Sequence, residues 1–408
     1  MINDSANSGK LLRADATPDA INFLRTVATL MVFNQHMQQI ENNALISRLP
    51  FGVLFRSCAW AGVWIFFILS GYLAGKSFEC GRYAPDASGT VRYYRQRLLK
   101  TWLPTVIFVL AEMLISHPQS LKGNRKLILR LFTFTFNGGG GYSGMGHTWY
   151  IFILMWLYMF TPLTALLMKK LRGASQRNFL LRKAPAVILA FIAIAGFAYR
   201  IIALKSRLNW YYLVYTPPFG NIDLYFSGFL FAYILPEMKK PDNKTRKTVL
   251  KVAAAALFIG FILFNSWFYL MTTPGRFSVR TYQYFFPTCY IIVVLFYLFA
   301  FDAANSHQKR KQATFRTILR HPLRITDAFA SVSFWAYLFH IEVKKHLLEM
   351  FGTADTFTRY ILFFITAISI SCLFGKIYGD GVTLLIKNGE NFVKDAYLRL
   401  RRRKTASS

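Results

Sequence analysis

Arg25 and His36 are ionisable residues inside a largely apolar segment that runs from residue 18 to residue 40. They are eleven residues apart, about three turns of an α-helix, so both side chains would project from one helical face roughly 16 Å apart. An ionisable side chain inside a membrane costs several kcal/mol unless it faces protein or a water-filled cavity. We therefore expect Arg25 and His36 to line one shared interior, with His36 nearer the outer surface.

The chemistry that His36 offers is proton transfer. Neutral imidazole accepts a hydroxyl proton at physiological pH because its reference pKa is about 6.5, which makes His36 a candidate general base. Each residue alone has a structural alternative: Arg25 could anchor the helix end by snorkelling, and His36 could make a helix-to-helix hydrogen bond. Their placement on one face favours the functional interpretation.

Two further histidines are expected at a similar depth, His147 at the start of one apolar stretch and His340 in the outer half of another. Asp223 and Glu342 could orient these imidazoles or make structural hydrogen bonds. The three histidines lack the HxxxH or carboxylate-linked spacing that is typical of zinc sites, so we expect no metal. The four cysteines are far apart, which indicates neither a zinc site nor a redox pair; they are Cys58, Cys80, Cys289 and Cys372.

The elements that must position these residues are transmembrane helices. Of the 408 residues, 54% are hydrophobic and 17% aromatic, a composition too apolar for a water-soluble domain. Apolar stretches of about 20 residues match the length that a helix needs to cross a bilayer. The predicted spans are 18–40, 58–79, 98–116, 147–168, 184–204, 217–236, 249–270, 281–302, 328–350 and 357–386. We predict an all-α transmembrane bundle of about ten spans over residues 18–387, between an N-terminal tail (1–17) and a basic tail (388–408).

The net charge of +31 lies in the loops, so it indicates topology and no nucleic-acid partner. With a cytoplasmic N-terminus, the inner loops hold most of the Lys and Arg, and both termini are cytoplasmic. The loop 117–146 is a basic exception, and its segment 125–136 could be an interfacial helix or a re-entrant piece. The first twenty residues lack the order of a secretory signal, so the first span is expected to be retained.

Four segments resemble the acyltransferase-3 family of membrane acyltransferases, which modify bacterial surface glycans and other extracytoplasmic acceptors. They occur in order along most of the chain: INFLRTVATLMVFNQH (21–36), GVWIFFILSGYLAG (62–75), GHTWYIFILMWLYMFTPL (146–163) and SFWAYLFH (333–340). The resemblance implies a coenzyme A thioester, preferably acetyl-CoA, bound from the cytoplasm, and a glycan hydroxyl approached from the other side. It also implies a multi-pass protein of the bacterial inner membrane.

Carried onto this chain, the resemblance makes His36 the catalytic candidate and Arg25 a donor-binding or pore-lining residue. The segment FFILSGY becomes a site-forming turn of the second span, with Ser70, Gly71 and Tyr72 on the donor side or lining the pore; helix packing through small residues is the alternative. The candidates for the acceptor side are His147, Trp149, Asp223 and His340.

A basic segment after the second span resembles the family's Arg-x-x-Arg element and suits the phosphates of coenzyme A. It holds Arg92, Arg95, Arg97 and Lys100. Its second half departs from the pattern as Arg97-Leu-Leu-Lys100, so either pair could be the equivalent one, and a plain positive-inside segment would look similar.

Two features limit the inference about the acceptor. Apolar residues follow Trp149 where many glycan-acetylating relatives carry acidic ones, and the sequence ends about twenty residues after the tenth span, so a further transfer step would need a partner. A glycan or small-molecule transporter or flippase also has charged groups inside many spans, although we see no inverted repeat. A non-catalytic scaffold would leave the same-face Arg25 and His36 unexplained. The oligomeric state is not indicated.

Overall fold

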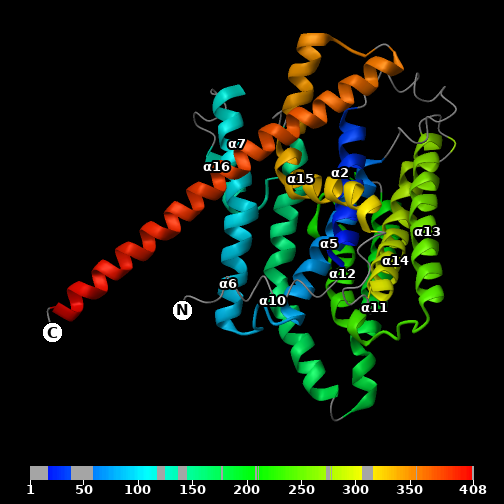
Figure 1. Cartoon of the computed structure of the whole chain (residues 1–408), viewed down its shortest axis with the longest axis horizontal. Coiled ribbons are helices and arrows are strands. Elements are labelled where there is room, and N and C mark those ends of the chain that lie inside the picture. The colour runs from blue at the N-terminus through cyan, green and yellow to red at the C-terminus, as the bar shows by residue number, and fades with distance from the viewer. Residues whose placement is uncertain are drawn as a thin grey trace.

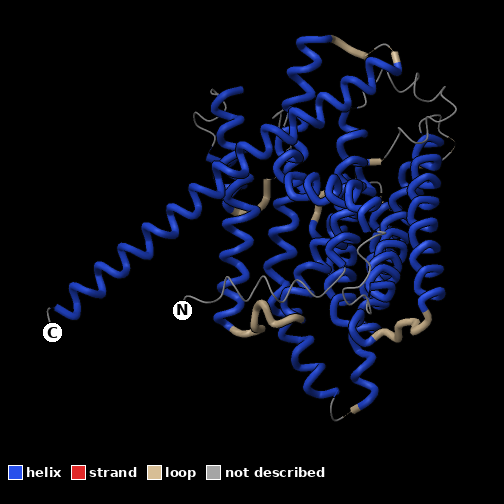
Figure 2. Tube along the Cα trace, in the orientation of Figure 1, coloured by secondary structure: helices blue, strands red, loops and turns tan. Residues whose placement is uncertain are grey.

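The computed structural model describes residues 17–37, 58–116, 125–136, 145–175, 178–206, 209, 211–272, 276, 278–305, 316–354 and 356–406. Within these ranges the chain is helical and contains no strand (Figure 2). The predicted all-α class is therefore confirmed.

Each of the ten predicted stretches contains a helix. The long helices are α2 (Thr17–Met37), α5 (Ala59–Glu79), α6 (Ala87–Arg97), α7 (Leu103–Ser116), α10 (Trp149–Ser175), α11 (Ala184–Lys205), α12 (Ile222–Ile234), α13 (Lys244–Thr272), α14 (Val279–Asn305), α15 (Arg316–Phe351) and α16 (Phe357–Ala406). Shorter elements connect them: the helix α9 (Arg125–Phe132), the π-helical turns η1 (Leu98–Trp102) and η4 (Tyr211–Tyr215), and the 3-10 turns η2 (Gly146–Thr148), η3 (Phe179–Lys183), η5 (Pro218–Asn221) and η6 (Leu235–Glu237).

Seven helical segments of the described chain are long and apolar enough to cross a membrane. They are Ala59–Glu79, Ala87–Ser116, Gly146–Ser175, Leu181–Lys205, Lys244–Thr272, Val279–Ala304 and Phe357–Phe392. The helices α2, α12 and α15 are not among them; α12 has only 13 residues. The count of ten spans therefore stays a prediction. These three helices are those that carry His36, Asp223 and His340.

The helices α5 and α12 pack closely against each other in the middle of the bundle (Figure 1). A Cβ added to Gly71 would lie 1.8 Å from the carbonyl oxygen of Tyr225, and one added to Gly75 would lie 2.3 Å from that of Phe229. On α12, a Cβ added to Gly228 would lie 2.0 Å from the carbonyl oxygen of Ile68. This Gly-xxx-Gly contact lets the two backbones touch. Around α5 pack α2, α10 and α14.

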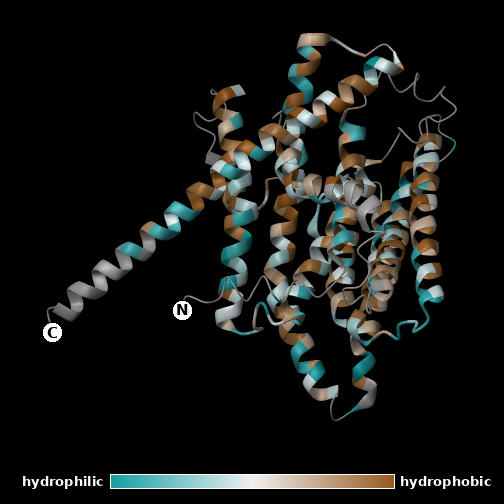
Figure 3. Cartoon of the chain, viewed as in Figure 1, coloured by the Kyte–Doolittle hydropathy of each residue, from teal (hydrophilic) through white to brown (hydrophobic). Residues whose placement is uncertain are grey.

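Large apolar side chains cover the outward faces of the peripheral helices, including Phe191 on α11, Val249 on α13 and Leu373 on α16 (Figure 3). Such faces are stable only against hydrocarbon, because water would have to solvate them. The surface therefore fits a lipid bilayer, as composition predicted.

Three local features differ from or refine the sequence expectations. The basic segment 92–100 is not a loop: it forms α6 and η1, which continue into α7. The segment 125–136 begins with the short helix α9, and the indole of Trp102 donates a hydrogen bond to the carbonyl of Leu131 in this helix (3.1 Å). This arrangement fits both an interfacial helix and a re-entrant piece. The last helix, α16, runs unbroken through residue 388 and extends beyond the bundle (Figure 1).

Candidate active site

Three histidines from distant parts of the chain meet inside the bundle. Nδ1 of His36, on α2, lies 2.7 Å from Nε2 of His340, on α15. The ring of His147, on η2, is 4.9 Å from that of His340 in an edge-to-face arrangement. The convergence predicted from sequence is therefore present, and His340 lies between the other two imidazoles.

The hydrogen bonds of this cluster define which nitrogen of His36 is available. Nδ1 of His340 lies 2.6 Å from the carbonyl oxygen of Tyr337, and because a carbonyl only accepts, Nδ1 must carry the proton. In neutral His340 the other nitrogen, Nε2, is then an acceptor, so Nδ1 of His36 must donate to it. We call His36 and His340 the dyad. In neutral His36, the lone pair on Nε2 takes no part in the hydrogen bond of the dyad.

The surrounding contacts hold both rings in place. Phe33 stacks on His340 with ring centroids 4.7 Å apart, so the helix that carries His36 also clamps its partner. His147 ties η2 to α15, because its Nε2 donates to the carbonyl of Leu338 (3.1 Å), while the hydroxyl of Tyr337 donates to the His147 carbonyl. His147 thus positions the cluster through the α15 backbone.

The two residues that precede His36 fix the end of α2, and the sequence analysis did not single them out. Asn34 accepts a hydrogen bond from the hydroxyl of Tyr360 (2.5 Å). Gln35 donates to the hydroxyl of Tyr269 (3.1 Å), and its amide oxygen accepts from the backbone N–H of Ala59. Two amides beside a histidine in an apolar segment were the available signal, since buried amides need partners.

A line of tyrosines leads from the histidines toward Arg25. The rings of Tyr337 and Tyr150 are 6.4 Å apart, and the hydroxyl of Tyr150 lies 3.2 Å from that of Ser70. Arg25 lies within electrostatic range of Tyr150 and Tyr158. Its guanidinium makes no hydrogen bond or ion pair within the described ranges. A half-buried cation without a carboxylate is a place where an anionic group would bind favourably.

Of the four basic residues of the 92–100 segment, Arg97 is the one that points inward. Its guanidinium stacks over Tyr93 at 5.0 Å and over Tyr158 at 4.7 Å, and its Nε is buried with no hydrogen-bond partner in the described part of the chain. Arg97 and Arg25 thus share Tyr158 as a neighbour. The other three side chains are exposed: Arg92, Lys100, and Arg95, which pairs with Glu390 of α16 (2.7 Å).

These residues lie within one recognisable sequence unit. The family model of the acyltransferase-3 family, described as an acyltransferase domain, matches residues 19–376. The chain belongs to the acyltransferase-3 family. Together with the apolar helices, this makes the protein a membrane acyltransferase. Searches of the curated proteins and of the solved structures found no match.

Within this acyltransferase-3 chain, two residues of the FFILSGY segment contact α12. Gly71 lies against the carbonyl of Tyr225, and Tyr72 is buried with its ring 6.4 Å from that of Phe231, so both pack on α12. These contacts fit the helix-packing alternative for this segment. Ser70 contacts the tyrosine line through the hydroxyl of Tyr150.

Two acceptor-side candidates make contacts with groups other than the imidazoles. Trp149 is buried against Tyr215, with ring centroids 4.5 Å apart. Asp223 does not orient a histidine: it is fully buried in a forked ion pair with Arg200 of α11 at 2.6 and 3.0 Å. Arg200, a lone cation in an apolar segment, was not anticipated from sequence, although a buried charge of this kind calls for a partner.

Glu342 is likewise not a partner of His340. Two residues along an α-helix turn by about 200°, so Glu342 lies on the opposite side of α15, with Glu112 and Lys345 as its charged neighbours. Within the described ranges, no group of three or more His, Cys, Asp or Glu residues is arranged to hold a metal ion.

Proposed function

We propose that this membrane acyltransferase moves an acetyl group from cytoplasmic acetyl-CoA to a hydroxyl of an extracytoplasmic glycan in the bacterial inner membrane. The observation that carries the proposal is the dyad of His36 and His340, which leaves one basic nitrogen of His36 available inside the bundle. The half-buried guanidinium groups of Arg25 and Arg97 lie at the other end of the tyrosine line, and neither has an ion-pair partner in the described part of the chain.

In the proposed reaction, Nε2 of His36 takes the proton of the acceptor hydroxyl as its oxygen attacks the thioester carbonyl. The tetrahedral intermediate collapses, the carbon–sulfur bond breaks, and the departing thiolate receives the proton from His36. While His36 is an imidazolium, its Nδ1–H donates to the lone pair of His340, and His340 is held by the carbonyl of Tyr337. His340 acts as a positioning residue, as the orienting carboxylate does in a hydrolase triad.

A second route uses the same lone pair. His36 Nε2 would attack the thioester carbonyl, the carbon–sulfur bond would break, and His36 would hold the acetyl group as an acyl-imidazolium while coenzyme A leaves as a thiolate. In a second step the acceptor oxygen takes the acetyl group, and the acceptor proton goes to the thiolate. Acid quenching of the enzyme with labelled acetyl-CoA in the absence of acceptor separates the routes, because only the second leaves label on the protein.

For the donor, we propose that Arg97 and Arg25 bind phosphate or the polarised thioester. Guanidinium groups pair with phosphate through two parallel hydrogen bonds, and neither of these two has a carboxylate partner in the described part of the chain. Exposed Arg92 and Lys100 on the same helix would attract the anionic nucleotide to this end. With both termini cytoplasmic, this end faces the cytoplasm.

The experiment is replacement of His36 by Ala, with His346→Ala as the matched control. His346 lies on α15, is exposed and pairs with Glu349 (3.1 Å). We expect His36→Ala to abolish acetyl transfer to surface glycans, measured by mass spectrometry, with expression and folding unchanged, and His346→Ala to retain it. Acetylation at the wild-type level in His36→Ala would refute the assignment.

A further inference from the structure

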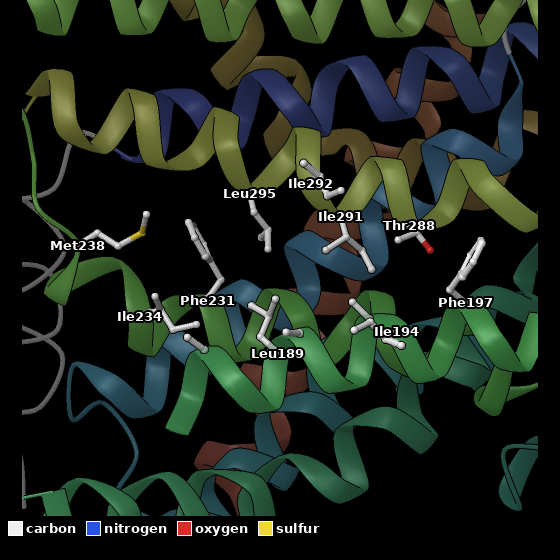
Figure 4. A pocket seen from close by; sticks show the side chains of 13 residues that line it. Leu189, Ile194, Phe197, Phe231, Ile234, Met238, Thr288, Ile291, Ile292 and Leu295 are labelled. Atoms are coloured by element: carbon white, nitrogen blue, oxygen red, sulfur yellow. The ribbon is translucent and has the colours of Figure 1, made fainter. Parts of the chain in front are cut away.

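A lateral groove of about 530 Å³ lies between α11 and α14, with α12 as its floor (Figure 4). On α11 it is lined by Ala186, Ala193 and Phe197, and across from them lies Leu295 of α14. Met238, which follows η6, lies at the end opposite Phe197 (Figure 4). We call this space the α11–α14 groove. All of its lining side chains are apolar except Thr288, so it suits hydrocarbon and not a polar ligand.

The length of the groove corresponds to one leaflet of a bilayer. From Ala186 to Phe197 the helix advances eleven residues, or about 16 Å at 1.5 Å per residue, and half of a hydrocarbon core is about 15 Å. At the far end the hydroxyl of Thr288 accepts a hydrogen bond from Arg200 (2.9 Å). The two terminal nitrogens of this guanidinium also donate to the carboxylate of Asp223. The polar groups at this end are therefore satisfied within the protein and do not call for a charged ligand.

The other end of the groove carries unpaired positive charge. Lys183 immediately precedes α11, and Lys239 follows Met238; both are exposed, and neither has an ion pair in the described part of the chain. The ion pair between Arg182 and Glu237 (3.3 Å) joins these two segments, so the two lysines flank one mouth. Lysines at the level of lipid headgroups attract anionic phosphates.

We propose that the α11–α14 groove binds one acyl chain of an anionic phospholipid, with its phosphate held between Lys183 and Lys239. Three features indicate this ligand: the apolar wall, the length of one leaflet, and the two lysines at one end that have no ion pair in the described part of the chain. Since α12 packs on α5 with one side and on α11 with another, it separates the groove from the histidines. The bound lipid therefore supports α12 and is not a substrate, and the inference does not depend on the proposed function.

The test uses the purified full-length protein, delipidated in detergent and then supplied with phosphatidylglycerol or phosphatidylcholine of the same acyl chains. Native mass spectrometry counts bound lipid, and thermal unfolding reports its effect. We expect one phosphatidylglycerol per chain and a higher Tm with it than with phosphatidylcholine. The double variant Lys183→Gln, Lys239→Gln should weaken phosphatidylglycerol binding roughly 30-fold, about fivefold for each lysine. The control Lys169→Gln, Lys170→Gln, also exposed, should not.

Filling the groove tests the acyl-chain site separately. Ala193→Trp places a large side chain in the space, whereas Ala195→Trp puts the same group on the exposed side of α11, outside the lining. The first variant should lose the bound lipid and the second should keep it. Equal retention of phosphatidylcholine, wild-type binding by Ala193→Trp, or an isoprenoid as the retained molecule would each overturn the proposal. If Ala193→Trp does not fold, the lysine variant still decides it, since exposed Lys→Gln changes leave the packing intact.

Discussion

The pairing of His36 with His340 predicts a specific kinetic defect when the pairing is removed. In His340→Ala, Nδ1 of His36 loses the acceptor that lies 2.7 Å away. A hydrogen bond to a charged group is worth about 1.5–3 kcal/mol, and about 1.36 kcal/mol is a factor of ten in rate. Because the bond is charge-assisted only once His36 is protonated, the loss should appear in kcat, and we expect a decrease of roughly 10- to 150-fold.

His340→Gln offers a matched rescue. A glutamine carbonyl can accept from His36 Nδ1 near the position of the imidazole Nε2, so this variant should recover a large part of the activity that His340→Ala loses. A purely structural role for His340, which is fully buried, would not distinguish the two variants in this way. The assay is acetyl transfer from labelled acetyl-CoA in membranes, normalised to folded protein by size-exclusion chromatography.

The double variant His36→Ala, His340→Ala gives the strictest test. Removal of a general base typically costs about 10²- to 10⁴-fold, and residues that act as a unit are not additive. The double variant should therefore be no slower than His36→Ala alone. A decrease equal to the product of the two single effects, or wild-type kcat in His340→Ala, would refute the proposed dyad.

Three other predictions concern the donor, the helix crossing and the buried ion pair. Arg97→Leu should raise the KM for acetyl-CoA tenfold or more, because it removes a charge-assisted phosphate contact. Arg92 is exposed, so Arg92→Leu should change this KM much less. Steady-state kinetics at varied acetyl-CoA concentration measures both. Gly71→Ala should destabilise the bundle by about 1–3 kcal/mol, because a Cβ there would lie 1.8 Å from a carbonyl oxygen. In the control Gly260→Ala the added Cβ has no neighbour within 4 Å, so the thermal unfolding midpoint should be unchanged or higher. Asp223→Asn, by leaving a buried guanidinium without its carboxylate, should cost about 3–5 kcal/mol, seen as a lower unfolding midpoint in detergent; an unchanged midpoint would mean that the ion pair does not hold α11 to α12.

Local features of this protein could be predicted from the sequence. Helical periodicity is a property of neighbouring residues, so the placement of Arg25 and His36 on one continuous helix needs no knowledge of the rest of the fold. The same holds for the apolar stretches, each of which contains a helix, because about twenty apolar residues in lipid satisfy their backbone only as a helix. The four segments that resemble the acyltransferase-3 family were likewise sufficient to identify it, as the match over residues 19–376 confirms.

What only the tertiary structure decided is which side chains meet. His36 and His340 are 304 residues apart, and no local pattern states that their ring nitrogens share a proton. The rotation of α6 relative to α10 places Arg97 against Tyr158 and leaves Arg92 exposed. The contact of α5 with α12 places Gly71 against the backbone of Tyr225. Asp223 pairs with Arg200 because α11 and α12 lie side by side. The physical reason is that burial and partnership depend on how helices rotate and cross, and that geometry comes from the packing of the whole bundle.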